Sequence, residues 1–371
     1  MPPANSSTQR RTTPWTGRVA LAGGSLLLTL LLLEAVFRVA GWGVAYEPRT
    51  DQVFPPADGK FEALPHSFVP GANFVSRYAS DHRGTFGPSR SVEHHFNSAG
   101  WRDREHSLEK PAGTYRILGL GDSYLFGQGV QQEETVLSRL EGLLREDTGR
   151  DIECINTGIS GFNTQNERDL LIHRGLAYEP DMVVVFFVLN DVEPNRDRDE
   201  RPIEFFREYM AIYGEQDTLS EYSRLWNWAR RRFVQRTRAN TYIRQCVEGF
   251  SPNSRDWRNC RAALDEIRDV CRSANVKLLV AVFPFFVDLD GDYPFQPIHD
   301  VVRDHCQEAG IEVLDLTAAY EGYRGPELWV HPTDQHPNEI AHDIAARAVA
   351  AHIQGTPALA IEPAPAAADG S

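Results

Sequence analysis

A serine stands where an α/β protein can use it as a nucleophile. Gly121-Asp122-Ser123-Tyr124 directly follows the apolar run from Tyr115 to Leu120, which has the length of a buried strand. Open α/β sheets bind their ligands outside the carboxyl ends of their strands, so Ser123 is expected at a ligand-binding edge. A hydroxyl is a weak nucleophile, and it needs a base within hydrogen-bond reach and donors for the oxyanion that its attack creates.

Three later segments contain residues of these types. Asn156-Thr157-Gly158-Ile159-Ser160-Gly161 and Leu189-Asn190-Asp191 follow two further apolar runs, and His331-Pro332-Thr333-Asp334-Gln335-His336-Pro337-Asn338 precedes the last helical pattern. Each segment alone is ordinary turn chemistry, because Gly, Asn, Asp and Ser are frequent in turns. Their order and placement are more informative than any one of them, because each follows a predicted strand or begins a predicted helix.

This order resembles that of the SGNH hydrolases, the GDSL-like family, in a membrane-anchored bacterial form. The blocks of that family are GDS, a glycine after the second strand, an asparagine in an Asn-Asp pair, and a final aspartate and histidine. The resemblance runs from Tyr115 to Ile353, apart from one insertion. It implies a Ser-His-Asp site made of Ser123, His336 and Asp334. It also implies an oxyanion hole formed by the Ser123 and Gly161 backbone N–H groups and the Asn190 amide, with Gly158 as the alternative glycine.

The last block departs from the commonest family spacing. Two residues usually separate the aspartate from the histidine, but here only Gln335 stands between Asp334 and His336, and Thr333 occupies the usual aspartate position. The shorter spacing resembles that of SGNH-like proteins of polysaccharide O-acetylation. Either Asp334 reaches the imidazole, or His336 relies on a backbone carbonyl.

The central part of the chain alternates short apolar runs with helical patterns, which is typical of parallel βαβ units. We predict an α/β fold, a flavodoxin-like three-layer α/β/α sandwich with a central parallel sheet, over residues 113–354. The expected strands are Tyr115 to Leu120, Ile152 to Asn156, Met182 to Val188, Val276 to Phe283 and Ile311 to Leu314. The expected helices are Glu133 to Glu146, Gln165 to Gly175, Trp257 to Ser273, Pro297 to Ala309 and Asn338 to Ile353.

One interval, residues 193–260, is too long for a crossover helix. It is strongly charged but contains many aromatic residues, and we expect a helical insertion that forms a lid or cap. Its arginines, among them Arg230, Arg231 and Arg232, could contact anionic lipid or an acidic glycan, although a solvated helix face is the simpler interpretation.

The amino terminus has the pattern of a signal anchor. Arginines precede an uncharged, leucine-rich run from Val19 to Leu33, so we predict a cytoplasmic tail over 1–17 and a single transmembrane helix over 18–41. The catalytic domain would then be periplasmic or extracellular. A cleaved signal peptide is the competing interpretation, because small residues lie between Ala40 and Ala45.

The two remaining segments have different compositions. Residues 42–112 are rich in Pro, Gly, His and Asp but also carry several Phe and a Trp, so we expect an extension that packs on the main domain. Its sequence Phe96-Asn97-Ser98-Ala99-Gly100-Trp101-Arg102-Asp103 resembles a feature of membrane-anchored members of the family. Arg102 could neutralise a buried carboxylate or meet substrate, and we expect a structural role for it. Residues 355–371 are rich in Pro and Ala and are expected to be disordered.

Composition excludes some classes of protein. With 52 acidic and 38 basic residues the formal net charge is -14, the wrong sign for a general binder of nucleic acid. The five cysteines form no metal-binding spacing, and neither a metal nor an organic cofactor is expected. Cys246 and Cys260 form a disulfide or remain free thiols.

The leading hypothesis is an extracytoplasmic esterase that hydrolyses an acyl ester of a glycan or a lipid through an acyl-enzyme. An SGNH-type polysaccharide O-acyltransferase would use the same residues but transfer the acyl group to a sugar hydroxyl. A third hypothesis is a catalytically silent, membrane-tethered glycan-binding or scaffold protein.

Overall fold

The computed structural model describes residues 15–42, 67–78, 81, 83–192, 219, 222–230, 232, 247–287, 289, 291, 293–332 and 334–364. The chain forms two compact units, which are treated separately below. One consists of Met1–Ala45 with Gly214–Thr237, and the other of Tyr46–Tyr213 with Arg238–Ser371.

The larger unit is built on a parallel sheet with the strand order β4-β3-β5-β6-β7, which confirms the predicted flavodoxin-like fold. The apolar runs form strands because their side chains are covered on both faces of the sheet; β5, for example, is buried at every position. The bounds are β3 Tyr115–Gly121, β4 Ile152–Asn156, β5 Met182–Phe187, β6 Lys277–Val282 and β7 Glu312–Asp315.

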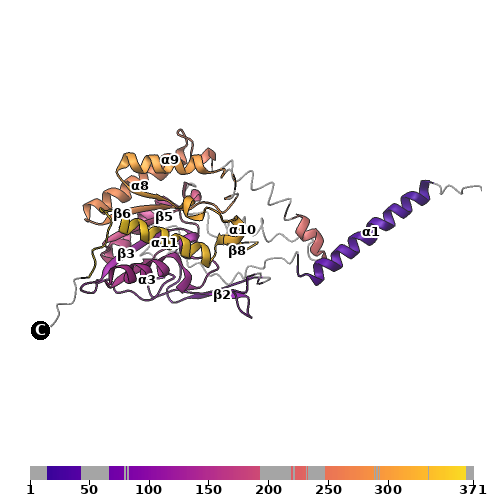
Figure 1. Ribbon diagram of the computed structural model, residues 1–371, viewed down its shortest axis with the longest axis horizontal. Helices are drawn as coiled ribbons and strands as arrows, with labels where there is room; N and C mark the ends of the chain where they lie inside the picture. Colours follow the sequence, from indigo (N-terminus) through magenta and orange to yellow (C-terminus); the bar gives the residue numbers. More distant parts are fainter. Residues whose placement is uncertain are drawn as a thin grey trace, which may run out of the picture. The chain divides into compact units, whose positions relative to one another are not determined.

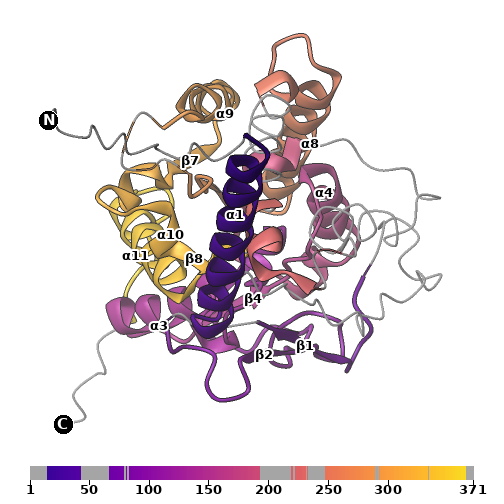
Figure 2. The same ribbon diagram turned by 90° about the vertical axis from the view of Figure 1, so that its right-hand side faces the viewer.

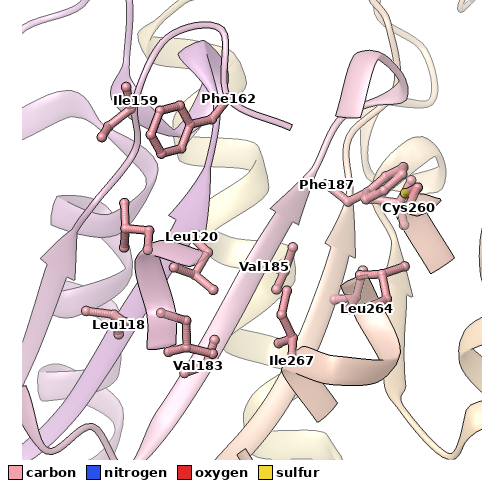
Figure 3. Close-up of a cluster of buried hydrophobic side chains, with 14 of the residues drawn as sticks. Leu118, Leu120, Ile159, Phe162, Val183, Val185, Phe187, Cys260, Leu264 and Ile267 are labelled. Atoms are coloured by element: carbon pink, nitrogen blue, oxygen red, sulfur yellow. The ribbon is translucent and has the colours of Figure 1, made fainter. Parts of the chain in front are cut away.

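Helices cover both faces of this sheet, as Figures 1 and 2 show. Alternate strand residues point to opposite sides, so Val183 and Val185 pack toward α8 (Figure 3) while Val184 and Phe186 pack toward α3 and α11. The first layer consists of α4 Thr164–His173, α8 Arg255–Ser273 and α9 Gln296–Ala309. The second consists of α3 Val136–Thr148 and α11 Glu339–Gly355.

In the described residues, short elements connect the longer strands and helices and shape the loops. Four of them are 3-10 turns: η1 Gln132–Glu134, η2 Gly175–Tyr178, η3 Leu189–Val192 and η4 Leu316–Tyr320. Before α11 the chain forms the short helix α10 Gly325–Leu328 and an antiparallel hairpin of β8 Trp329–His331 and β9 Asp334–Pro337. This hairpin was not predicted, because three or four residues give no measurable hydrophobic periodicity.

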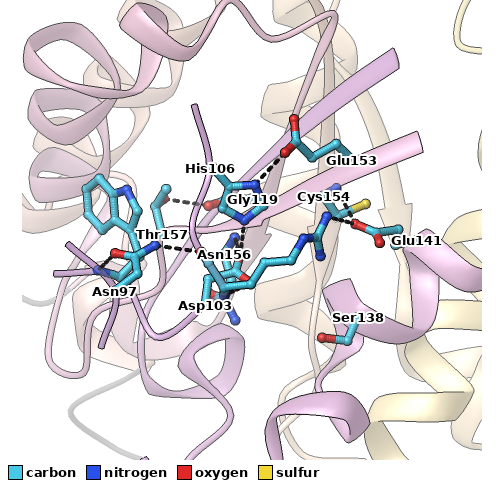
Figure 4. Close-up of polar contacts among 12 residues, drawn as sticks. Asn97, Asp103, His106, Gly119, Ser138, Glu141, Glu153, Cys154, Asn156 and Thr157 are labelled. Atoms are coloured by element: carbon cyan, nitrogen blue, oxygen red, sulfur yellow. Dashed lines mark hydrogen bonds and ion pairs between the residues drawn. The ribbon is translucent and has the colours of Figure 1, made fainter. Parts of the chain in front are cut away.

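The described part of the extension packs on the sheet. It contains the antiparallel pair β1 Asn73–Arg77 and β2 Ser91–His95, and it then runs along the edge strand β4 (Figure 4). An edge strand exposes unpaired N–H groups, which need partners when they are buried. On β4 the N–H of Asn156 donates to Asp103 over 2.7 Å, and that of Cys154 donates to Glu141 over 2.8 Å.

The carboxyl-terminal tail differs from the expectation of disorder. After α11 ends at Gly355, Leu359 and Ile361 are buried in the layer of α3 and α11. The Ala364 N–H donates to the carbonyl of Thr148, over 2.9 Å. Two apolar side chains among Pro and Ala therefore suffice to attach residues 355–364, and residues 365–371 lie outside the described part of the chain.

The smaller unit contains the apolar helix α1, Trp15–Val39, which is long and apolar enough to cross a membrane. It begins three residues before the predicted start. Part of the insertion belongs to the same unit, and its residues 224–230 are helical. In the larger unit Cys260 is a buried free thiol whose sulfur lies 3.3 Å from the Thr164 hydroxyl, whereas Cys246 lies outside the described residues.

Candidate active site

The predicted nucleophile lies at the first residue of a single helical turn, α2 Ser123–Phe126, directly after β3. Asp122 caps this turn, because its carboxylate accepts a hydrogen bond of 2.8 Å from the Tyr124 N–H. An N-cap aspartate satisfies a backbone donor that the helix itself cannot satisfy. The Gly-Asp-Ser sequence thus ends the strand and begins the turn that presents the Ser123 hydroxyl.

The histidine of the last block contacts this hydroxyl, and the aspartate contacts the histidine. His336 Nε2 lies 2.8 Å from Ser123 Oγ, and His336 Nδ1 lies 2.5 Å from Asp334 Oδ1. Both residues belong to β9, where side chains two positions apart point to the same side of the strand. Of the two arrangements that the one-residue spacing left open, the structure has the one in which Asp334 reaches the imidazole.

Asp334 has a second partner, which sequence analysis missed. The Tyr78 hydroxyl, from the residue after β1, donates to Asp334 Oδ2 over 2.9 Å. Tyr78 is buried, and its ring stacks on Phe86 at a centroid distance of 4.3 Å. No motif marks this tyrosine, so its presence among the aromatic residues of the extension was the only available signal.

Electrostatics fit an ion pair between the histidine and the aspartate. Burial alone would lower the pKa of His336, but the charge and hydrogen bond of Asp334 raise this pKa above its ordinary value. Burial would raise the pKa of Asp334, but the His336 charge, the His336 hydrogen bonds and the Tyr78 hydroxyl bring it below its ordinary value. Asp334 is therefore an ionised acceptor at neutral pH.

The second block forms a loop over α2, in which its two glycines have different environments. Gly158 approaches the nucleophile's turn so closely that a Cβ would lie 2.5 Å from the Phe126 nitrogen, and its N–H donates to Asn156 Oδ1 over 2.9 Å. Gly161 has a φ of 81°, which favours glycine, and its N–H makes no hydrogen bond within the described residues. Gly161 thus keeps a donor available, whereas the donor of Gly158 is used.

The third block lies in η3, after β5. The Asn190 side-chain amide donates to Asp122 Oδ2 over 2.9 Å, beside the nucleophile's turn. Asp191 holds the loop in shape, because its carboxylate accepts a hydrogen bond of 2.8 Å from the Val188 N–H. An amide group carries two hydrogens, so Asn190 has one donor left for a substrate oxygen after it has bound Asp122.

Arg102 holds the chain that follows the nucleophile. Its buried guanidinium donates to the carbonyls of Phe126, the last residue of α2, and of Gly127 and Val130 just after it. Burial lowers the pKa of Arg102 to about 9. This arrangement agrees with the structural role expected for Arg102. His331 is likewise buried, with its ring beside that of Tyr78.

A buried glutamate lies beneath the site and was also missed. Glu167 on α4 is 1% exposed, and neither of its carboxylate oxygens has a hydrogen-bond partner within the described residues. Burial, together with the charge of Asp122, raises the pKa of Glu167 well above its usual range and so favours the neutral acid. Its sequence context, between Asn166 and Arg168, resembles a solvated helix face and gave no sign of burial.

A doubly wound sheet whose carboxyl edge carries these blocks defines an ester-hydrolysing serine hydrolase. Residues 120–344 match the family described as GDSL-like Lipase/Acylhydrolase family, more than half of the chain, and the protein belongs to that family. No curated protein matches the chain.

Several solved structures resemble the chain distantly. A lipase/acylhydrolase from Enterococcus faecalis has 15% identity and a TM-score of 0.40, with 65% of this chain and 96% of that one covered. The psychrotrophic esterase EstA from Pseudoalteromonas sp. has 16% identity and a TM-score of 0.39, with 65% and 97% covered. A two-domain esterase active on acetylated mannans has 15% identity and a TM-score of 0.41, with 69% and 54% covered. The family assignment depends on the sequence match and not on these likenesses.

Proposed function

We propose that the protein is an extracytoplasmic serine esterase in which Ser123 attacks an acyl ester, with His336 as general base and Asp334 as the residue that orients it. The observation that carries this proposal is the continuous chain of contacts from Ser123 Oγ to His336 Nε2, 2.8 Å, and from His336 Nδ1 to Asp334, 2.5 Å. This sequence of hydroxyl, imidazole and carboxylate activates the serine in hydrolases of unrelated folds.

The reaction has two halves. His336 takes the hydroxyl proton while Ser123 Oγ forms a bond to the ester carbonyl carbon, and the imidazolium then returns that proton to the departing alcohol as the ester bond breaks. Water attacks the acyl-enzyme in the same way, with His336 again as base, and the carboxylic acid and the free Ser123 hydroxyl are released. Asp334 stays ionised throughout and stabilises the imidazolium.

The negative oxygen of each tetrahedral intermediate needs donors. We assign them to the Ser123 N–H, the Gly161 N–H and the Asn190 amide, because Gly161 keeps an unused N–H and Asn190 an unused hydrogen near the hydroxyl. Gly158 is the weaker candidate, since its N–H already donates to Asn156.

A fluorophosphonate probe tests the nucleophile. We expect the wild-type protein to be labelled and Ser123→Ala to remain unlabelled, while Ser138→Ala, a serine on α3, labels like the wild type. Equal labelling of Ser123→Ala would refute the assignment, and an unlabelled wild type would favour the silent scaffold. A series of p-nitrophenyl esters from acetyl to long acyl chains then separates an acetylated glycan from a lipid as the substrate class.

Acyl transfer to a sugar hydroxyl is the second candidate, because the one-residue spacing of Asp334 and His336 resembles that of polysaccharide O-acetylation proteins. The acyl-enzyme would be the same, and only its acceptor would differ. Measuring acetate release with and without a glycan acceptor separates the two reactions, and transfer is excluded if the acceptor is never acylated.

We further infer that α1 is an uncleaved anchor in the cytoplasmic membrane, with the larger unit on the outer side. Arg10, Arg11 and Arg18 precede the apolar run and favour an inside amino terminus. Protease added to spheroplasts should digest a carboxyl-terminal tag on the larger unit and spare an amino-terminal tag. Digestion of only the amino-terminal tag would reverse the orientation.

A further inference from the structure

Within the smaller unit, the last two turns of α1 are covered on one side only. Phe37 is buried and Glu34 is partly covered, while the other side chains from Leu33 to Val39 are exposed. The covering segment is residues 222–230 of the insertion, seen in Figure 1 as the short salmon-coloured helix beside the end of α1. Glu34 and Phe37 lie three positions apart and therefore share one face of α1.

Glu34 accepts hydrogen bonds from the backbone N–H groups at the start of this short helix. Its carboxylate accepts hydrogen bonds from the Ser223 hydroxyl, 2.8 Å, and from the N–H groups of Arg224 and Leu225, each 3.0 Å. The first N–H groups of a helix have no partner within it, and a negative charge at that end is favourable. Glu34 of α1 thus caps a helix that lies about 190 residues further along the chain.

The contact is reciprocal. Arg38 donates to the Tyr222 carbonyl over 2.6 Å, and Arg224 donates to the Arg38 carbonyl at the end of α1 over 3.1 Å. Phe37 meets the ring of Trp228 edge to face at a centroid distance of 5.4 Å. Polar and aromatic contacts together attach the segment to α1.

The segment carries aromatic rings and positive charge that remain partly exposed, including the ring of Trp228 beside Phe37. Trp226 and Trp228 remain 43% and 39% exposed, and the Arg232 guanidinium lies over the Trp228 ring at 5.2 Å. Residues 222–232 contain four arginines and no acidic residue, in a chain whose net charge is -14. Trp is enriched at membrane interfaces, and arginine clusters bind anionic lipid headgroups.

The position of Glu34 along α1 matches the boundary between the hydrocarbon core and the lipid headgroups. At about 1.5 Å per residue, Glu34 lies ~28 Å from Trp15, close to the ~30 Å thickness of a hydrocarbon core. A segment capped by Glu34 is therefore held at the level where the apolar core meets the headgroups.

We propose that residues 222–230 and Arg232 form a membrane-surface element, in which Trp226 and Trp228 enter the boundary of the bilayer and Arg230 and Arg232 bind anionic phospholipid headgroups. This inference rests on the proposed anchoring of α1. It also gives the anchor a reason to be retained, because cleavage between Ala40 and Ala45 would remove the Glu34 cap from the segment.

Quenching of tryptophan fluorescence by brominated phospholipids tests the proposal in the full-length protein reconstituted in vesicles. The reference protein carries Trp15→Phe and Trp42→Phe, so that tryptophans near the ends of α1 do not contribute. Adding Trp226→Phe and Trp228→Phe to this protein should remove most of the emission that the brominated lipids quench. Trp257→Phe, at a buried position in the larger unit, serves as the matched control and should leave the quenched emission unchanged. Quenching that survives the loss of Trp226 and Trp228 would overturn the inference.

Two further variants test the headgroup contact and the Glu34 cap separately. Adding phosphatidylglycerol to the vesicles should increase quenching in the wild type but not in Arg230→Gln/Arg232→Gln, and an equal increase in both would refute the headgroup contact. Glu34→Ala should reduce the Trp226 and Trp228 contribution, whereas Thr29→Ala, on an exposed part of α1, should not. A protein that does not float with the vesicles refutes the anchor together with the inference. A protein that floats without quenching at Trp226 and Trp228 refutes only the inference.

Discussion

The hydroxyl of Tyr78 offers a sharp test of how the site works. Tyr78→Phe removes one oxygen and keeps the ring stacked on Phe86, so the change isolates the 2.9 Å hydrogen bond to Asp334. Asp334 is buried, and its Oδ2 would lose the partner that Tyr78 provides. The perturbation therefore acts on the orienting carboxylate without touching Ser123 or His336.

A hydrogen bond to a charged group contributes roughly 1.5–3 kcal/mol, and each ~1.4 kcal/mol corresponds to tenfold in rate. If the transition state depends fully on this bond, kcat falls about 10- to 100-fold. Loss of the whole orienting aspartate costs ~10⁴, which sets the upper limit. KM should stay the same, because the buried hydroxyl of Tyr78 binds the carboxylate and not the substrate.

The pH profile gives the decisive readout. The Tyr78 hydroxyl lowers the pKa of Asp334, so its loss makes the carboxylate a stronger acceptor and raises the pKa of His336 further. The general base must be neutral, so the acid limb of kcat/KM should move to higher pH. Steady-state kinetics on a soluble p-nitrophenyl ester between pH 5 and 9 measures both the rate and the limb.

Tyr320→Phe is the matched control. Tyr320 is fully buried and its hydroxyl also donates over 2.9 Å, but to the neutral carbonyl of Ala341. This variant should lose about 1 kcal/mol of unfolding free energy, with kcat and the acid limb unchanged. If Tyr78→Phe likewise loses only stability and keeps its rate within twofold, Tyr78 is merely structural and the reasoning fails.

Three further predictions concern other residues in and around the site. Asn190→Ala should lower kcat by about 10²–10³ with little change in KM, because the lost donor acts on the developing oxyanion; an unchanged kcat would exclude Asn190 from the oxyanion hole. Asp334→Asn should move the acid limb of kcat/KM to lower pH, because burial still lowers the pKa of His336 while the Asp334 charge that raises this pKa is gone. This shift is opposite to the one expected for Tyr78→Phe. A shift in the same direction would contradict the ion pair. Glu167→Gln should flatten the dependence of stability on pH. Because the pKa of Glu167 is raised in the folded protein, this group contributes stability below its pKa in the unfolded chain, and that contribution is lost as the pH rises. The wild type should therefore lose free energy of unfolding between pH 4 and pH 8 that the variant keeps. Urea unfolding at several pH values measures this, and parallel curves for both proteins would show that Glu167 is not buried as a neutral acid.

The sheet could be predicted because each strand is an apolar run covered on both faces, and Met182–Phe187 is the plainest case. The blocks could be predicted because Ser123, Asn190 and His336 belong to short sequences with a fixed order along the chain. Tyr78 and Glu167 could not be predicted. Their roles arise from contacts across the fold, 256 residues apart for Tyr78 and Asp334, and no local pattern records such contacts.

The tail differs from the prediction for another reason, which is composition. Proline and alanine suggested disorder after Gly355, but burial of Leu359 and Ile361 is decided by the two side chains and not by the average of the segment. In the insertion the aromatic residues suggested a lid. That lid stays a prediction. The described helix of the insertion contacts α1, through Glu34 and Phe37, which only the three-dimensional structure identifies as its partners.

The spacing of Asp334 and His336 follows from the hairpin in which they lie. With one residue between them, both side chains can point the same way only in an extended strand, and β9 supplies that conformation. A two-residue separation would turn the aspartate to the opposite side of the same strand, where it could not reach the imidazole. The spacing therefore has a local structural cause, and it motivates the acyl-transfer candidate without by itself identifying the acceptor of the acyl group. Whether water or a sugar hydroxyl receives that group depends on what reaches the acyl-enzyme at Ser123, so the acceptor experiment, and not the motif, distinguishes hydrolysis from transfer.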